Sequence, residues 1–250
     1  MTNSLQNRVA LVTGASRGLG AAIATSLAEA GCSVAVNYFA SPERANALCA
    51  TLQAQGHKAQ AFKADVRDEA DVKQLFADVR EALGEPDIVV ANATAHQPML
   101  AVEDQTWQAY LDQLEFFVKS PLLLMQAALP HWRKVGRGRF IQIGSEVVEL
   151  GNPRFANYVA AKAAQLGQTR SWARELGPAG ITVNLVAPGW IPTERAVEAD
   201  DTERAAYLSR VPLGAGRAAD VGAAVVYLAS DAATFITGQK IAVNGGNTLE

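Results

Sequence analysis

The stretch TGASRGLG, from Thr13 to Gly20, places three glycines and an arginine between the apolar run VALV and the helix-like pattern AAIATSLAEAG. Glycine weakens helices and strands, so a cluster at this point needs a local reason. In open α/β sheets a ligand binds beyond the carboxyl ends of the strands, where a helix amino terminus offers free N–H groups to phosphate. Side chains at Gly14, Gly18 and Gly20 would block the turn or the approach of a pyrophosphate, which predicts a nucleotide site.

Apolar runs of strand length recur along the chain with helical patterns between them: RVALVTG, SVAVNYF, KAQAFKAD, DIVVANA, GRFIQIGS, GITVNLVAPG and GQKIAVNGG. Continuous apolar character is typical of strands buried on both faces, hence of a parallel sheet covered by helices. We predict one α/β domain over residues 1–250, with a doubly wound, Rossmann-type parallel sheet of about seven strands. The polar segment around 190–210 is either a substrate lid or an ordinary surface helix and loop.

The composition favours a globular enzyme-sized domain and excludes several other classes. The chain has 250 residues, 49% of them hydrophobic, and a formal net charge of −3, which argues against a nucleic-acid-binding surface. The two cysteines, Cys32 and Cys49, are too few for a disulfide framework or a zinc site, so we expect no metal and a cytoplasmic protein. The run PLLLMQAALP is too short to span a bilayer, so we also expect no membrane partner.

The spacing Thr-Gly-x-x-x-Gly-x-Gly resembles that of the short-chain dehydrogenase/reductase family. The motifs KADV, ANA, IGS, YVAAK, VNLVAPGWIPTE and ITGQKIAVNGG follow in the family's order, so the resemblance covers nearly the whole chain. Within the family, the chain resembles the beta-ketoacyl carrier-protein reductase-like members. The resemblance implies an oxidoreductase that transfers hydride between a nicotinamide cofactor and a carbonyl or secondary alcohol, and it implies a homotetramer.

Charge at the second strand favours NADP(H) over NAD(H). A carboxylate there would bind the ribose diol of NAD and repel a 2′-phosphate, but the sequence has Asn37 instead. Arg17, in the glycine loop, can pair with that phosphate, although an ordinary surface arginine is the alternative, and Ser41 can donate a hydrogen bond. By resemblance, the cofactor also contacts Ser16, Leu19, Tyr38, Asp65, Val66, Asn92, Ala93, Pro188, Gly189, Ile191 and Thr193.

Tyr158 and Lys162 are four residues apart, so on one helix they project from the same face. A phenol with a pKa of about 10 is a poor base at neutral pH, and a neighbouring ammonium favours its phenolate. Ser145, after the run GRFIQI, can hydrogen-bond a carbonyl or hydroxyl oxygen. We predict that Tyr158 is the acid/base, with Ser145 and Lys162 beside it, and the resemblance implies that Lys162 also binds the nicotinamide ribose.

Two positions depart from the family pattern. Phe117 stands where the family has a fourth catalytic residue, an asparagine that maintains a helix distortion and a water relay to the lysine, and Thr94 stands where the family has glycine. These departures motivate an alternative function, that of a nucleotide-binding regulatory protein with impaired catalysis. Retention of Ser145, Tyr158 and Lys162 argues against it.

The substrate remains open at the level of sequence. The resemblance suggests that His96 and Trp190 face the substrate, and Val147, Leu150 and Trp190 would form an apolar wall for a partly hydrophobic carbonyl compound. The basic run HWRKVGRGR suits an acidic carrier protein, or it simply stabilises the dipole of a helix carboxyl terminus. A small-molecule carbonyl or alcohol and a carrier-bound ketoacyl group are therefore both candidate substrates.

Overall fold

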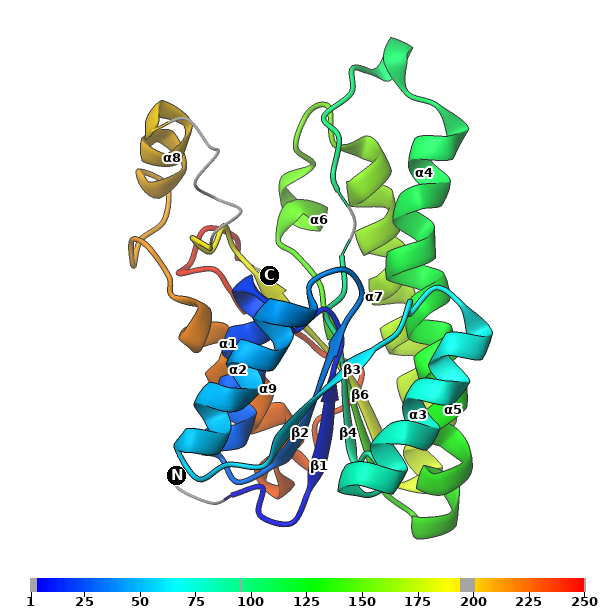
Figure 1. Ribbon diagram of the computed structural model, residues 1–250. Helices are drawn as coiled ribbons and strands as arrows, with labels where there is room; N and C mark the ends of the chain where they lie inside the picture. Colours follow the sequence, from blue (N-terminus) through cyan, green and yellow to red (C-terminus); the bar gives the residue numbers. More distant parts are fainter. Residues whose placement is uncertain (1–3, 95, 194–200, 250) are drawn as a thin grey trace.

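The computed structural model describes residues 4–94, 96–193 and 201–249. Its centre is a parallel sheet of seven strands in the order β3-β2-β1-β4-β5-β6-β7 (Figure 1). The strands are β1 (Val9–Val12), β2 (Ser33–Tyr38), β3 (Ala59–Lys63), β4 (Ile88–Ala91), β5 (Gly138–Ile143), β6 (Ile181–Pro188) and β7 (Lys240–Val243). The strand order changes direction between β1 and β4, which opens a crevice for ligand at their carboxyl ends. The predicted doubly wound parallel sheet is confirmed.

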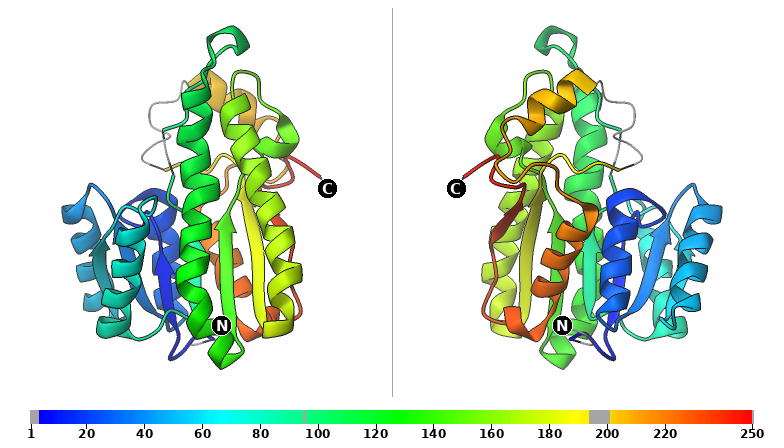
Figure 2. Two further views of the ribbon diagram at one scale, coloured as in Figure 1. Left: turned by 90° about the vertical axis from the view of Figure 1, so that its right-hand side faces the viewer. Right: turned by 90° about the vertical axis from the view of Figure 1, so that its left-hand side faces the viewer.

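Helices cover both faces of the sheet (Figures 1 and 2). One face carries α1 (Gly18–Glu29), α2 (Pro42–Ala54) and α9 (Ala218–Ala229), and the other carries α3 (Glu69–Leu83), α5 (Ser120–Val135) and α7 (Ala156–Leu176). Shorter helices are α4 (Trp107–Leu114), α6 (Val147–Leu150), α8 (Asp201–Leu208) and the single turns η1 (Val102–Asp104), η3 (Gly177–Ala179) and η5 (Asp231–Ala233). Among the described residues, no helix is long and apolar enough to cross a membrane.

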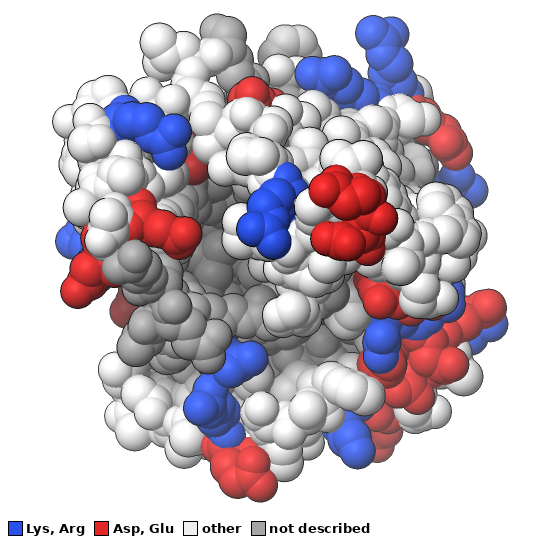
Figure 3. All heavy atoms as spheres, turned by 90° about the horizontal axis from the view of Figure 1, so that it is seen from above, with Lys and Arg blue, Asp and Glu red and all other residues white. Residues whose placement is uncertain are grey.

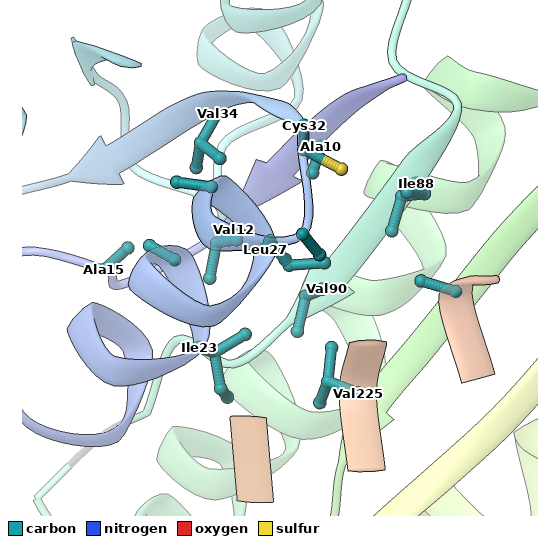
Figure 4. Packing of buried hydrophobic residues seen from close by; sticks show 14 of the residues in the cluster. Ala10, Val12, Ala15, Ile23, Leu27, Cys32, Val34, Ile88, Val90 and Val225 are labelled. Carbon is teal, nitrogen blue, oxygen red and sulfur yellow. The ribbon is translucent and has the colours of Figure 1, made fainter. Parts of the chain in front are cut away.

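The continuous apolar runs become strands that are buried on both faces. Every residue of β1, β4, β5 and β6 is buried. Because side chains alternate across a strand, Val12 packs with Ile23 and Leu27 of α1, as Figure 4 shows, whereas the neighbouring Leu11 belongs to the core on the opposite face. Two hydrophobic cores therefore hold the sheet rigid, and the carboxyl ends of its strands form a fixed platform for a site.

A distortion interrupts the long helical segment that passes this platform. Between α4 and α5 the chain forms a π-helix, η2 (Glu115–Lys119), with Phe117 at its centre. Single π-helical turns are uncommon and occur frequently at functional sites. The helix distortion is therefore present although the asparagine is absent.

The segment around 190–210 is described only in part, because residues 194–200 lie outside the described residues. Its second half forms α8, whose residues are exposed or half-buried. Glu203 and Tyr207 of this helix line the cavity described below. The lid and the single-domain organisation stay predictions.

Candidate active site

A cavity of about 810 Å³ lies at the carboxyl ends of the strands. Figure 3 looks onto this end of the molecule, where the surface is hollowed and side chains of both charges surround the hollow. The predicted cofactor residues all line this cavity: Gly14, Ser16, Arg17, Gly18, Leu19, Gly20, Asn37, Tyr38, Ser41, Asp65, Val66, Asn92, Ala93, Tyr158, Lys162, Pro188, Gly189, Ile191 and Thr193. Within the described part of the chain, no group of three or more potential metal ligands is found.

The glycine loop is packed tightly against the segment after β4. Gly14 has a φ of +60°, and a Cβ there would lie 2.8 Å from Cα of Ala93. A Cβ on Gly20 would lie 2.5 Å from both the Asn92 amide nitrogen and the Gly14 carbonyl oxygen. Asn92 donates from that amide to the carbonyl oxygens of Thr13 (2.9 Å) and Gly14 (3.2 Å). The missing side chains at Gly14 and Gly20 therefore let the segments after β1 and β4 meet.

The loop leaves an anion-binding position open at the amino terminus of α1. Arg17 is the N-cap residue, and the first turn of α1 contains no acidic side chain. The Arg17 side chain is exposed and makes no ion pair with any residue of 4–94, 96–193 or 201–249. Ser41, the N-cap of α2, makes no capping hydrogen bond through its hydroxyl in this same described part. The residues fit a dinucleotide with an additional phosphate.

Asn37 has a structural role that the sequence did not suggest. It is 2% exposed, and its amide oxygen accepts a hydrogen bond from the Gly14 N–H (3.2 Å). Its amide nitrogen donates to the carbonyl oxygens of Ala64 (3.2 Å) and Phe62 (3.4 Å). Asn37 thus ties the glycine loop to β3 while it also lines the cavity, and its contact with the cofactor stays a prediction. Tyr38, one residue later and half-buried, lines the cavity.

Asp65 lies at the same edge and is held by an arginine that the sequence analysis did not single out. Arg67 donates to both carboxylate oxygens of Asp65, at 2.9 and 2.7 Å, and this contact lowers the pKa of the carboxyl below its ordinary value. The guanidinium also lies 4.8 Å from the ring centroid of Phe116 in η2. Arg67 thus gives the adenine side of the predicted cofactor site a rigid planar cation, which a basic residue two positions after Asp65 could have signalled.

The predicted catalytic residues are brought together by β5 and α7. Ser145 follows the end of β5, and Tyr158 and Lys162 lie on α7, with all three lining the cavity. The Lys162 ammonium nitrogen lies 5.7 Å from the centroid of the Tyr158 ring. Lys162 is 3% exposed, and burial lowers its pKa well below the ordinary lysine value. The rings of Phe117 and Phe155 pack edge-on against Tyr158, at centroid distances of 5.5 and 5.8 Å.

Two glutamines support the π-helix that carries Phe117. Gln113, in α4, donates from its side-chain amide to the main-chain oxygen of His96 (2.8 Å). Gln168, in α7, donates to the main-chain oxygen of Val118 (3.0 Å). Gln168 thus ties η2 to the helix that bears Tyr158, and Gln113 ties the end of α4, just before η2, to the segment after β4.

Comparisons with known proteins agree with this geometry. The family model described as enoyl-(acyl carrier protein) reductase matches residues 14–248. The chain belongs to the short-chain dehydrogenase/reductase family. It is 41% identical over 240 residues, 95% of this chain and 96% of the relative, to 3-oxoacyl-(acyl-carrier-protein) reductase FabG of Staphylococcus aureus. The protein of the same name from Escherichia coli is 40% identical over 246 residues, 97% of this chain and 98% of the relative.

A solved structure gives the same answer for the fold. The crystal structure of a dehydrogenase/reductase from Sinorhizobium meliloti superimposes with a TM-score of 0.90 at 34% identity, covering 99% of this chain and 98% of that one. The predicted family is therefore confirmed. As a short-chain dehydrogenase/reductase, the protein is an oxidoreductase that acts on a carbonyl or its alcohol.

In this short-chain dehydrogenase/reductase the substrate end of the cavity differs in one residue from the expectation. Val147, Leu150 and Trp190 line it as predicted. His96 does not, since its side chain is exposed and its main-chain oxygen holds Gln113. Thr94, Gln97, Met99, Asn152, Pro153 and Phe155 line the cavity instead. Three of these residues follow β4 and three lie between α6 and α7, and the sequence alone gave no signal for either group.

A buried carboxylate next to Ser145 was also missed. Glu146 is 3% exposed and accepts hydrogen bonds from the Tyr207 hydroxyl (2.6 Å) and the Asn247 amide (3.0 Å). The Tyr207 oxygen in turn accepts from the Trp190 N–H (2.8 Å). Burial and the Glu146 contact raise the pKa of Tyr207 to about 12. One hydroxyl thereby joins α8 to the loops that follow β5 and β6.

Proposed function

We propose that this protein is an NADP(H)-dependent reductase of carbonyl compounds, or a dehydrogenase of the corresponding secondary alcohols. The observation that carries the proposal is that one cavity contains both the open anion site at Arg17 and the group Ser145, Tyr158 and Lys162. An exposed arginine at a helix amino terminus, with no acid in the first turn, favours a dinucleotide with an extra phosphate.

The catalytic group suits acid/base work on an oxygen atom. The Ser145 hydroxyl hydrogen-bonds the substrate oxygen, and Tyr158 donates a proton to it during reduction or accepts one during oxidation. When bound, the nicotinamide supplies the hydride for the carbonyl carbon or accepts it in the reverse direction. The positive charge of Lys162 favours the phenolate form of Tyr158. Acid/base catalysis of this kind contributes ~10²- to 10⁴-fold to the rate.

A ketoacyl group attached to a carrier protein is the second candidate substrate. The names of the relatives support it, since the S. aureus and E. coli proteins are called 3-oxoacyl-(acyl-carrier-protein) reductases. The basic run 131–139 does not, because it spans the end of α5 and the start of β5 and so lies at the opposite end of the sheet from the cavity. Arg137 is paired with Asp87 (2.8 Å), and Arg139 is 4% exposed. A carrier protein would therefore dock elsewhere.

We further propose a homotetramer, which exposed apolar side chains on α4, on α5 and after η5 support. They are Trp107 (68% exposed), Leu122 (38% exposed) and Phe235, which is fully exposed. Exposed aromatic side chains of this size are typical of surfaces that associate. Light scattering at micromolar protein concentration measures the mass directly, and a mass near the 26.4 kDa of one chain would refute the assembly.

The test of the function is oxidation of NADPH and NADH by the purified protein over ketones, diketones, quinones and ketoacyl thioesters. The thioesters are offered both free and on an acyl carrier protein. We expect turnover with NADPH to exceed turnover with NADH. Saturable dependence on the carrier would favour the second candidate substrate, whereas cofactor binding without turnover on any compound would favour the regulatory alternative.

A further inference from the structure

The ammonium group of Lys162 is enclosed by neutral partners, two of which are unexpected. Its nitrogen donates to the main-chain oxygen of Ile143 at the end of β5 (2.7 Å) and to the side-chain oxygen of Gln165 (3.2 Å). It also lies 3.7 Å from the centroid of the Phe117 ring. An ammonium has three N–H donors, so a carbonyl, an amide oxygen and a π face satisfy its capacity.

Both unexpected partners are buried and lie behind the cavity. Gln165 and Phe117 are each 1% exposed, and neither lines the cavity. Gln165 is on α7, one helical turn after Lys162, whereas Phe117 reaches the ammonium from η2. A buried polar side chain is costly unless it is hydrogen-bonded, and the amide oxygen of Gln165 is used on the ammonium. These residues therefore contact Lys162 without reaching a bound cofactor or substrate.

The other surroundings of Lys162 offer it no compensating charge. The end of β5 presents a carbonyl oxygen, η2 presents the Phe117 ring, and α7 itself presents Tyr158. Glu115 and Lys119 of η2 are 44% and 52% exposed and form an ion pair with each other at the surface. Burial lowers the pKa of Lys162, and no carboxylate of the described residues opposes that effect.

We infer that Gln165 and Phe117 are positioning residues that keep the Lys162 ammonium protonated and aimed at Tyr158. An amide oxygen and the negative face of an aromatic ring both stabilise a cation without adding a titratable group. This pair replaces the support that a polar side chain at position 117 would provide. The inference rests on the proposed role of Tyr158 as the acid/base.

The direct test is a titration of Lys162 in the cofactor-free protein. Lysine labelled with ¹³C at Cε gives one NMR signal for each of the seven lysines, and Lys162→Met identifies the signal of interest. Removing the amide in Gln165→Leu should lower the pKa of Lys162 by about one unit. Removing the ring in Phe117→Leu should lower it by about half a unit. Gln165→Glu keeps an acceptor and adds a negative charge, so it should raise the pKa above that of the parent.

A matched control separates this effect from the loss of any buried amide. Gln142 is 0% exposed and donates from its side-chain amide to the Thr169 hydroxyl (2.9 Å) and to the main-chain oxygen of Gln165 (3.4 Å). It makes no hydrogen bond to the Lys162 ammonium or to the Gln165 side chain, whose oxygen accepts from that ammonium. Gln142→Leu should reduce thermal stability but leave the titration of Lys162 unchanged. An unchanged pKa of Lys162 in Gln165→Leu, or an equal shift in Gln142→Leu, would overturn the inference. If Gln165→Leu fails to fold, the sign of the shift in Gln165→Glu decides the question.

Turnover provides a second readout that is specific to positioning. Lys162 acts while it is charged, so the alkaline limb of the plot of kcat against pH should move to lower pH in Gln165→Leu. In Gln165→Glu this limb should move back to the pH of the parent or above it. The KM for the cofactor should change less than twofold, since neither side chain lines the cavity. A parent that never turns over would defeat the proposed function, whereas the cofactor-free titration would still decide whether Gln165 and Phe117 hold the charge.

Discussion

The substitution Asn37→Asp should destabilise the protein without changing its choice of cofactor. The change preserves shape but replaces the amide nitrogen by a carboxylate oxygen. That oxygen would face the carbonyl oxygens of Ala64 and Phe62, which now accept hydrogen bonds at 3.2 and 3.4 Å. These hydrogen bonds and a third, to the main-chain oxygen of Tyr38 (3.4 Å), are lost at a site that is 2% exposed, and a charge is left buried with the Gly14 N–H as its donor. The expected loss is about 2 to 4 kcal/mol of unfolding free energy.

Urea denaturation measures this loss, and initial rates with NADPH and NADH measure the preference. Tyr38→Asp is the matched variant, because Tyr38 lines the cavity and is half-buried. It should keep most of the stability and reduce kcat/KM for NADPH at least tenfold relative to NADH, since a carboxylate there repels a 2′-phosphate. A stable Asn37→Asp protein that prefers NADH would refute the reasoning about this strand end.

Three further substitutions test other parts of the account. Phe117→Asn should change turnover less than tenfold. The π-helix exists without asparagine, and the new amide oxygen can replace the Phe117 ring as a partner of the Lys162 ammonium. A hundredfold gain in turnover would show that the parent is an impaired catalyst. Tyr207→Phe should cost about 1 to 3 kcal/mol by urea denaturation, since Glu146 loses a 2.6 Å donor. The unfolding free energy that the Tyr207 hydrogen bond contributes is complete below pH ~10 and is lost as the pH rises through about 12. Only the parent should therefore lose this part of its stability in that range. If stability fell equally with pH in the parent and in Tyr207→Phe, the role given to Tyr207 would be contradicted. Gly138→Ala would place a Cβ inside the indole of Trp132 and should cost about 1 to 3 kcal/mol in a thermal or urea melt with kcat unchanged, whereas unaltered stability would contradict the packing.

The parts of the site that sequence reasoning found depend on local rules. Tyr158 and Lys162 share a helix face because they are four residues apart, and Gly14 precedes a helix because a strand-like run ends just before it. The sheet itself was predictable, since strands buried on both faces carry no polar alternation. Such features need only neighbouring residues to be recognised.

The parts that sequence reasoning missed depend on contacts between distant residues. The Glu146 carboxylate is satisfied by Tyr207, which is 61 positions later, and neither residue carries a motif. His96 turned out to be exposed because the chain after β4 turns its side chain away from the cavity. The Asn37 side chain points inward because the main-chain oxygens of Phe62, in β3, and of Ala64, just after β3, accept its hydrogen bonds. The spacing of apolar residues along the sequence does not indicate which polar side chain will hydrogen-bond a residue far away in the chain.

The proposed role of Tyr158 as the acid/base is tested by comparing hydride transfer in the parent and in Tyr158→Phe at saturating NADPH. The ring is kept in Phe, so its edge-on packing against Phe117 and Phe155 should persist and cofactor binding should be retained. We expect the variant to bind NADPH within a few-fold of the parent and to lose at least ~10²-fold in kcat for carbonyl reduction. A variant that reduces the same substrate at the parent's rate would contradict the assignment of Tyr158 as the acid/base.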